Sequence, residues 1–294
     1  MVASAEIIER VIATFEKAGA LNRTNPLRRG NVVELNPSDE GDVLISADLH
    51  GNRRNFHRIL EIADLDQRPL RHLIMQEVCH GGPTYPSGGG CMSHLMLEDI
   101  AALKTKYGEH FHFLLSNHEL AELTDFPIMK AKRMLNLMFR CGLQEMYGAA
   151  ADRVREAATA FIASLPLAVR LPNGVFACHS LPAETDSRGF DTTVFQRELS
   201  ASDIAEGGPA FRLTWGRDYR QENADAFAQL VDARVIVTGH EPCPSGFQAP
   251  NNRQIIIDCC GDTATYLLLP LTATPIEHDQ VLRQVQPLHN GRAA

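Results

Sequence analysis

Short apolar runs alternate with amphipathic stretches along most of the chain. Residues 42–48 (DVLISAD) form an apolar run rich in β-branched residues that ends at a carboxylate, and residues 50–65 follow with apolar side chains at helical spacing. Further short apolar runs lie at residues 72–78, 111–117, 175–179 and 234–240. Strands that alternate with helices predict an α/β fold with buried sheets.

Two other stretches have a helical pattern. The N-terminal segment places Ile7, Val11 and Phe15 at helical spacing, which predicts an amphipathic helix. Residues 127–164 are also typical of helix, with a break near Cys141–Gly142. We expect the second stretch to be an inserted or covering element.

The C-terminal residues, from 254 onward, predict two final strands and a tail. Residues 254–260 and 265–271 indicate two antiparallel strands of a closing sheet, whereas residues 272–294 contain few apolar side chains. No linker divides the chain, so we expect one domain over residues 1–271 and a loosely packed tail. The glycine- and proline-rich segment 81–90 excludes regular structure and is expected to be a flexible loop at the rim of the site.

Composition narrows the class of protein. The chain has 294 residues, of which 44% are hydrophobic and 22% are charged, as in ordinary globular proteins. Its 28 Lys and Arg against 36 Asp and Glu give a net charge of −8, which argues against a general nucleic-acid or membrane-surface binder. No apolar run approaches the ~20 residues that a membrane span needs.

Cysteine usage indicates a reducing compartment. The seven cysteines are odd in number and form no C-x-x-C pair, so neither a disulfide framework nor a zinc knuckle fits. The N-terminus lacks the uninterrupted apolar core of a signal peptide. We therefore expect a cytoplasmic location.

Polar side chains suited to metal binding follow five of the predicted strands. They are Asp48, His50, Glu77, Asn117, His118, His179 and His240. In layered α/β proteins ligands bind at the carboxyl ends of strands, because the loops there converge on one crevice. Histidine nitrogens mixed with carboxylate and amide oxygens suit Mn, Fe or Zn ions. Such a set is too large for one tetrahedral zinc but fits two metals that share a bridging carboxylate.

Several motifs resemble those of a known family. Residues 47–52 (ADLHGN) and 116–119 (SNHE) are similar to the D-x-H-G and G-N-H-E blocks of the calcineurin-like metallophosphoesterases, closest to their phosphoprotein phosphatase branch. Residues 97–119 resemble the helix and strand that lead into G-N-H-E in that branch. LTWGRD (213–218) and VTGHEP (237–242) resemble its later blocks in the same order.

The resemblance implies a fold and a cofactor. The fold would be a two-sheet β-sandwich flanked by helices, in four αββα layers, and the cofactor two divalent metal ions (Mn, Fe or Zn). The implied ligands are Asp48 and His50 for the first ion, Glu77 for the bridging position, and Asn117, His179 and His240 for the second ion.

The resemblance also implies an activity. The family hydrolyses phosphate monoesters with a hydroxide that the metals activate, and His118 would be the general acid that protonates the leaving group. Phosphorylated serine or threonine proteins are the first expected substrates. Two alternatives stay open: a nucleotide or dinucleoside polyphosphate hydrolase, and a degenerate, non-catalytic phosphate-binding member.

The second family block departs from its usual form, G-D-x-x-D-R-G. Residues 76–82 read QEVCHGG, so Glu77 replaces the bridging aspartate and must be accommodated by a retracted backbone. His80 stands where an aspartate would orient the general acid. It either takes part in the active site in this way or has only a structural role. Alternatively, Glu77 is an ordinary carboxylate at a strand end, and another residue occupies the bridging position.

The arginine that grips phosphate in the family has no counterpart here, because Gly81 stands at its position. Bidentate arginine contacts bind phosphate more strongly than generic positive charge does. Arg53, Arg54 and Arg217 are the available replacements, and Arg217 is favoured because the family places a substrate arginine near its block.

Overall fold

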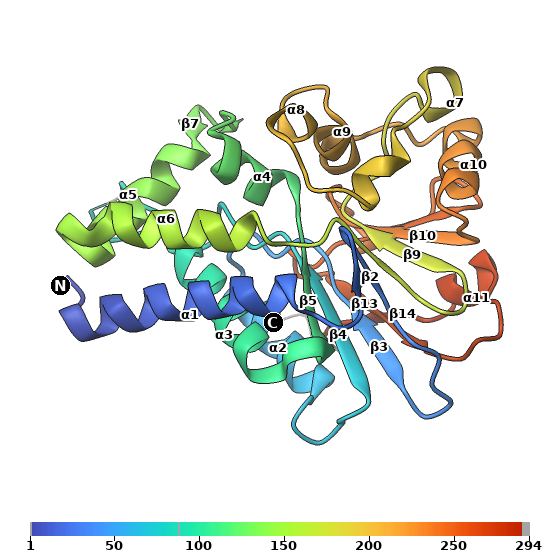
Figure 1. The fold of residues 1–294 in the computed structure, drawn as a ribbon, viewed down its shortest axis with the longest axis horizontal. Coiled ribbons are helices and arrows are strands. Elements are labelled where there is room, and N and C mark those ends of the chain that lie inside the picture. The colour runs from blue at the N-terminus through green and yellow to red at the C-terminus, as the bar shows by residue number, and fades with distance from the viewer. Residues whose placement is uncertain (1, 88, 290–294) are drawn as a thin grey trace.

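Two mixed β-sheets flanked by helices make up the protein (Figure 1), in a computed structural model that describes residues 2–87 and 89–289. The seven-stranded sheet contains, in spatial order, β1 (Arg28–Arg29), β2 (Val32–Glu34), β8 (Ala168–Arg170), β9 (Val175–Cys178), β10 (Val235–Thr238), β12 (Gln254–Ile257) and β11 (Phe247–Gln248). The five-stranded sheet contains β14 (Val285–Pro287), β13 (Thr265–Pro270), β3 (Asp42–Ile45), β4 (Arg71–Gln76) and β5 (Phe111–Leu114). A separate hairpin joins β6 (Met129–Lys130) to β7 (Arg133–Met134).

The central strands run parallel and are buried. Strands β3, β4 and β5 are parallel neighbours, as are β9, β10 and β12. Every residue of β4, β9, β10 and β12 is buried, as expected for parallel strands that are covered on both faces. Because these strands are parallel, their carboxyl ends lie at the same edge of each sheet.

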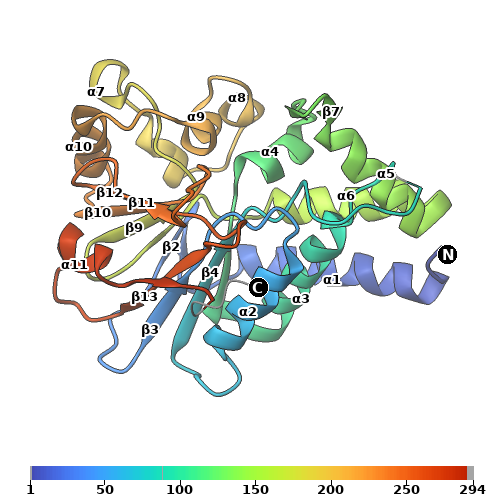
Figure 2. The ribbon, with the colours of Figure 1, turned by 180° about the vertical axis from the view of Figure 1, so that it is seen from behind.

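Helices cover both outer sides. The α-helices are α1 (Ala5–Arg23), α2 (Arg53–Ala63), α3 (Ser93–Tyr107), α4 (Asn117–Thr124), α5 (Leu135–Tyr147), α6 (Ala151–Ile162), α7 (Thr185–Arg188), α8 (Ala201–Ile204), α9 (Pro209–Trp215), α10 (Gln221–Leu230) and α11 (His278–Leu282). Short 3₁₀ turns lie at η1 (Gly108–His110), η2 (Gly148–Ala150) and η3 (Thr192–Phe195). Helices α1 to α3 lie on the side of the five-stranded sheet and α7 to α10 on the opposite side (Figures 1 and 2). The predicted two-sheet sandwich with helices on its outer faces is confirmed.

None of the helices in the described ranges is long and apolar enough to cross a membrane.

The covering element at 127–164 differs from its prediction in two details. It begins with the β6–β7 hairpin, and helix α5 continues through Cys141 and Gly142 without a break. The chain breaks instead at Gly148, which has a positive φ of 54°. Gly142 serves packing rather than a turn, because a Cβ there would overlap the Cys91 carbonyl.

The predicted pairing of residues 254–260 with 265–271 is wrong. Strand β12 pairs with β10 and β11, whereas β13 pairs with β3 and β14 in the other sheet. The intervening turn crosses between the sheets, and Cys259 Sγ donates to Thr265 O over 3.0 Å. Two adjacent apolar strands carry no local signal for the sheet that each one joins.

The tail also packs more closely than predicted, as far as it is described. Val281 of α11 and Leu288 are buried, and β14 forms an antiparallel pair with β13. The segment is thus anchored to both sheets, because α11 contacts β12 of the seven-stranded sheet and β14 pairs with β13 of the five-stranded sheet. Residues 290–294 of the predicted tail lie outside the described residues.

Candidate active site

Polar side chains from both sheets meet where the parallel strands end. Asp48 follows β3, Glu77 follows β4, Asn117 follows β5, His179 follows β9 and His240 follows β10. All five are buried. A cavity of about 440 Å³ opens beside them, and its other lining residues include His50, His118, Trp215, Arg217, Asp258 and Lys130.

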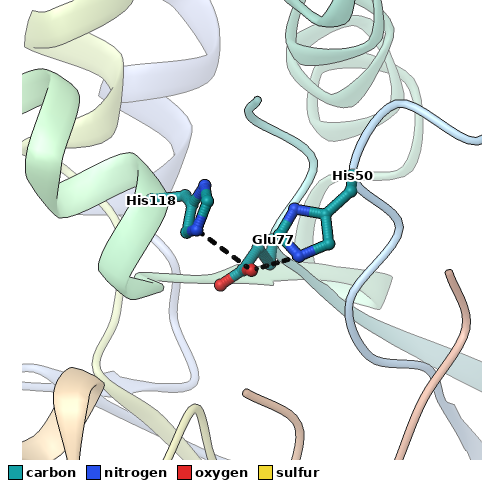
Figure 3. A group of neighbouring side chains, drawn as sticks. All are labelled: His50, Glu77 and His118. Atoms are coloured by element: carbon teal, nitrogen blue, oxygen red, sulfur yellow. Dashed lines mark ion pairs between the residues drawn. The ribbon is translucent and has the colours of Figure 1, made fainter. Parts of the chain in front are cut away.

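Glu77 lies at the centre of this group. Its Oε1 is 2.9 Å from His50 Nε2 and 3.9 Å from His118 Nε2 (Figure 3), and its Oε2 is 2.8 Å from His179 Nε2. Burial opposes ionisation of Glu77, but the surrounding histidines hold its pKa well below the usual range. Burial likewise opposes charge on His50, yet Glu77 raises the pKa of His50 to about 9. An ionised Glu77 carboxylate and a protonated His50 imidazole therefore stabilise each other.

A second set of atoms converges on the other oxygen of Glu77. His179 Nε2 is 2.7 Å from Asn117 Oδ1, and His240 Nδ1 is 3.2 Å from both of these atoms. His179 Nδ1 lies 2.8 Å from Gln76 Oε1, an acceptor, so this contact places a proton on Nδ1. Burial opposes charge on His179, yet the charge of Glu77 raises its pKa. Its Nε2 faces two oxygens, Asn117 Oδ1 and Glu77 Oε2, and once Nε2 loses its proton the same atoms suit a cation.

Asp48 is oriented by the backbone of the other sheet. Its Oδ1 accepts a hydrogen bond of 3.0 Å from His240 N. Gly239 leaves room for this contact, since a Cβ there would overlap the same oxygen. Burial and the charge of Glu77 raise the pKa of Asp48 to about 7. Two carboxylates that share a buried site repel each other unless positive charge separates them.

These donors fit a pair of metal ions. Two groups have ligand atoms within 4.8 Å of one another, His50 with Glu77 and His118, and Glu77 with His179 and His240. Glu77 belongs to both groups, so its two oxygens face two different sets of ligands. The buried His240 Nε2 has no hydrogen-bond partner among the described residues, which leaves it free for a cation.

The first group differs from the predicted one in its third member. His118, predicted as the general acid, lies with His50 and Glu77, whereas Asp48 is not part of this group. Asp48 lines the same cavity. The structure thus brings all six predicted ligands into one region and adds His118 to the candidates for the first ion.

The backbone around the site is strained. His50, Glu77, His80 and His240 have positive φ angles of 43°, 47°, 63° and 71°. A non-glycine residue in this left-handed region costs roughly 1–2 kcal/mol, and such residues concentrate at functional sites. At Glu77 this conformation also directs its carbonyl to the amides of Leu49 and His50, at 2.8 and 3.2 Å, which ties the first two strand ends together.

His118 is connected to a buried carboxylate through His80. His118 Nδ1 lies 2.9 Å from His80 Nδ1, and His80 Nε2 lies 2.7 Å from Glu122 Oε1. Because a carboxylate accepts, His80 Nε2 donates to Glu122, and in this tautomer His80 Nδ1 accepts from His118 Nδ1. This network fixes the tautomer of His118 and leaves its Nε2 directed toward Glu77. Burial, opposed by the charge of Glu77, lowers the pKa of His118 to about 3.

Sequence reasoning missed Glu122 and a second glutamate. Glu122 lies four residues after His118 on α4, so both side chains share one helix face. Glu119 accepts from the amides of Val78 and Cys79 at 3.0 and 2.8 Å and fixes the loop after Glu77 against α4. The i+4 spacing to His118 was the available signal for Glu122.

The three predicted substrate arginines are occupied by other partners. Arg217 lines the cavity but is paired with Glu241. Arg53 lines a neighbouring cavity and is paired with Asp99. Arg54 lies 3.5 Å from Asp262 and lines neither cavity.

Comparison with known proteins identifies the fold. Neither a protein-family model nor a curated protein sequence matches this chain. Among solved structures, a protein serine/threonine phosphatase from Saccharomyces cerevisiae with similarity to human phosphatase PP5 aligns with a TM-score of 0.67, at 16% identity over 89% of this chain and 82% of its own. The protein has the calcineurin-like metallophosphoesterase fold.

A second solved structure has the same fold, but it is named as a phosphatase of another specificity. The cold-active protein-tyrosine phosphatase of a psychrophilic Shewanella species aligns with a TM-score of 0.55, at 14% identity over 92% of this chain and 84% of its own. The fold that the sequence motifs predicted is confirmed. At these identities the alignments establish the fold alone, so the activity has to be argued from the site.

Proposed function

We propose that this protein is a dinuclear metal-dependent phosphoesterase that hydrolyses phosphate monoesters. One observation carries the proposal: the buried Glu77 directs its two oxygens at two separate sets of candidate ligands beside one cavity. His50 and Asp48 would hold the first ion, Asn117, His179 and His240 the second, and Glu77 both. Two divalent cations so bound would neutralise phosphate oxygens and lower the pKa of a water molecule.

The chain itself supplies the proton for the leaving group. His118 Nε2 is directed into the cavity, and its Nδ1 is held by His80. A dianionic phosphate beside Nε2 raises the pKa of His118 above its value in the free protein, since opposite charge stabilises imidazolium. Glu122 stabilises the same cation through His80. The protonated Nε2–H then donates to the departing oxygen.

The yeast and Shewanella phosphatases with this fold are named as protein phosphatases, which makes a phosphoprotein the first substrate to test. The intact connection from His118 to Glu122 favours catalysis over a degenerate, non-catalytic role, because a binding module has no need for an oriented acid.

The activity is tested with p-nitrophenyl phosphate. Purified protein with Mn²⁺ is expected to release p-nitrophenol, and a chelator is expected to abolish the release. Phosphoserine and phosphotyrosine peptides, ATP and a dinucleoside polyphosphate then rank the substrate classes. Binding of two metal ions without turnover of any of these esters would refute the proposed activity and leave a binding role.

Glu122→Gln is expected to lower kcat roughly 10-fold while KM changes little. Glutamine keeps a hydrogen-bond acceptor for His80 but removes the charge, and a hydrogen bond to a charged group is stronger by about 1–2 kcal/mol. The loss should be larger for phenyl phosphate than for p-nitrophenyl phosphate, because the poorer leaving group depends more on protonation. Steady-state kinetics with both esters measure this.

Glu98→Gln is the matched control. Glu98 Oε1 lies 2.9 Å from His94 Nδ1, so it also contacts a histidine, but it lines neither cavity at the site. Removal of the charge of Glu98 should leave kcat unchanged. Equal losses in the two variants would show that Glu122 acts through folding alone.

A further inference from the structure

The cavity has one lysine without a carboxylate partner. Lys130 forms no ion pair within 4.0 Å among the described residues, whereas Arg217 and Arg53 are neutralised by Glu241 and Asp99. Lys130 is exposed at the mouth of the cavity.

Lys130 stands between two cavities. It lines the 440 Å³ cavity beside Glu77 and also a neighbouring cavity of about 540 Å³, which includes Arg53 and Gly81. His50 and His118 line both cavities as well. A phosphoryl group held beside the candidate metal ligands therefore shares a cavity with Lys130, and a leaving group near His118 has space to extend into the second cavity.

The hairpin that carries Lys130 is firmly attached. Leu135 N donates to Ile128 O over 2.8 Å, and Ile128 N donates to the buried Asn136 side chain over 2.9 Å. Asn136 in turn donates to Ala121 O of α4, over 3.3 Å. The base of the hairpin is thus tied to the helix that begins with Asn117 and His118.

The charges of the hairpin are arranged at a cost to its own stability. Lys130 lies directly opposite Arg133 in the β6–β7 register, and Lys132 occupies the turn with a positive φ of 63°. Like charges directly opposite each other destabilise a strand pair. An anion between the hairpin and the site removes that repulsion.

We propose that Lys130 binds the phosphoryl group of the substrate, in place of the arginine that is missing at Gly81. This inference rests on the proposed function and deepens it: the substrate class is a dianionic phosphate monoester that is bound by a point charge from the hairpin. A lysine ammonium group binds phosphate without the directional fork of arginine. The site therefore tolerates several orientations of the phosphoryl group.

Lys130→Met tests the proposal, with Lys132→Met as the matched control. Methionine keeps the length of the side chain and removes the charge, and Lys132 lies two residues away but lines neither cavity. Lys130→Met is expected to raise KM for p-nitrophenyl phosphate roughly 10- to 100-fold, since a charge-assisted contact is lost, while kcat changes less. Lys130→Arg should restore most of the affinity, and Lys132→Met should behave like the unaltered protein.

Calorimetric titration of the Mn²⁺-loaded protein with inorganic phosphate gives a readout without turnover. Lys130→Met is expected to weaken phosphate binding by a similar factor. Unchanged phosphate affinity and KM in Lys130→Met, with an active unaltered protein, would overturn the role of Lys130 alone. If the unaltered protein binds phosphate but hydrolyses no ester, the proposed function is overturned. The titration then decides the role of Lys130 in binding: weaker phosphate binding by Lys130→Met supports it, and unchanged binding overturns it.

Discussion

Glu77→Gln is expected to lower kcat at least roughly 10³-fold and to reduce the number of bound metal ions, because one carboxylate serves both sets of ligands. Glutamine has nearly the same shape but no charge, and it has only one oxygen to offer. The two oxygens of Glu77 now face His50 and His179, at 2.9 and 2.8 Å, so one of these contacts would become repulsive or be lost. Metal content by mass spectrometry after dialysis, together with steady-state kinetics, measures both effects.

Glu77→Asp separates charge from reach. Aspartate keeps the charge that neutralises two cations, but its side chain is shorter by one methylene group. Partial activity with two bound ions would support a bridging role, in which the charge matters more than the distance. Full activity with two metal ions in Glu77→Gln would refute the shared role of Glu77 and return it to an ordinary carboxylate at a strand end.

The arrangement of the site could be predicted from the sequence because its signals are local. An apolar run that ends in Asp48, Glu77 or His240 marks both the strand and its last polar residue. Parallel pairing then brings the strand ends to one edge, as β3, β4 and β5 show. The division of these side chains between two metal ions, in contrast, comes from the family resemblance and not from the strand ends.

Other features depend on contacts between distant segments and have no local signal in the sequence. Strands β12 and β13 are both short and apolar, and only their partners place them in different sheets. Gly142 resembles a helix break in the sequence but faces the Cys91 carbonyl in the fold. Closeness to His50 in the sequence favours Arg53 and Arg54, and the family resemblance favours Arg217, whereas Lys130 lines the cavity from a hairpin that the helical pattern concealed.

His118→Asn is expected to lower kcat for phenyl phosphate by roughly 10²- to 10⁴-fold, the usual contribution of a general acid. The loss for p-nitrophenyl phosphate should be much smaller, because its leaving group departs without a proton. Asparagine keeps a hydrogen-bonding group near His80 but has no group that titrates near neutral pH. Steady-state kinetics with the two esters measure both losses in kcat, and a much larger loss for phenyl phosphate identifies a general acid.

The same variant distinguishes the two roles that the geometry allows for His118. Its Nε2 lies with His50 and Glu77 as a candidate ligand of the first ion, yet its Nδ1 is held by His80 and, beyond it, by Glu122. A general acid can be removed without loss of metal, whereas a ligand cannot. Two bound ions in His118→Asn, with a loss that grows as the leaving group becomes poorer, therefore identify the acid. Loss of one ion, with equal losses for both esters, would instead make His118 a ligand, and the proton for the leaving group would then have to come from another residue of the cavity.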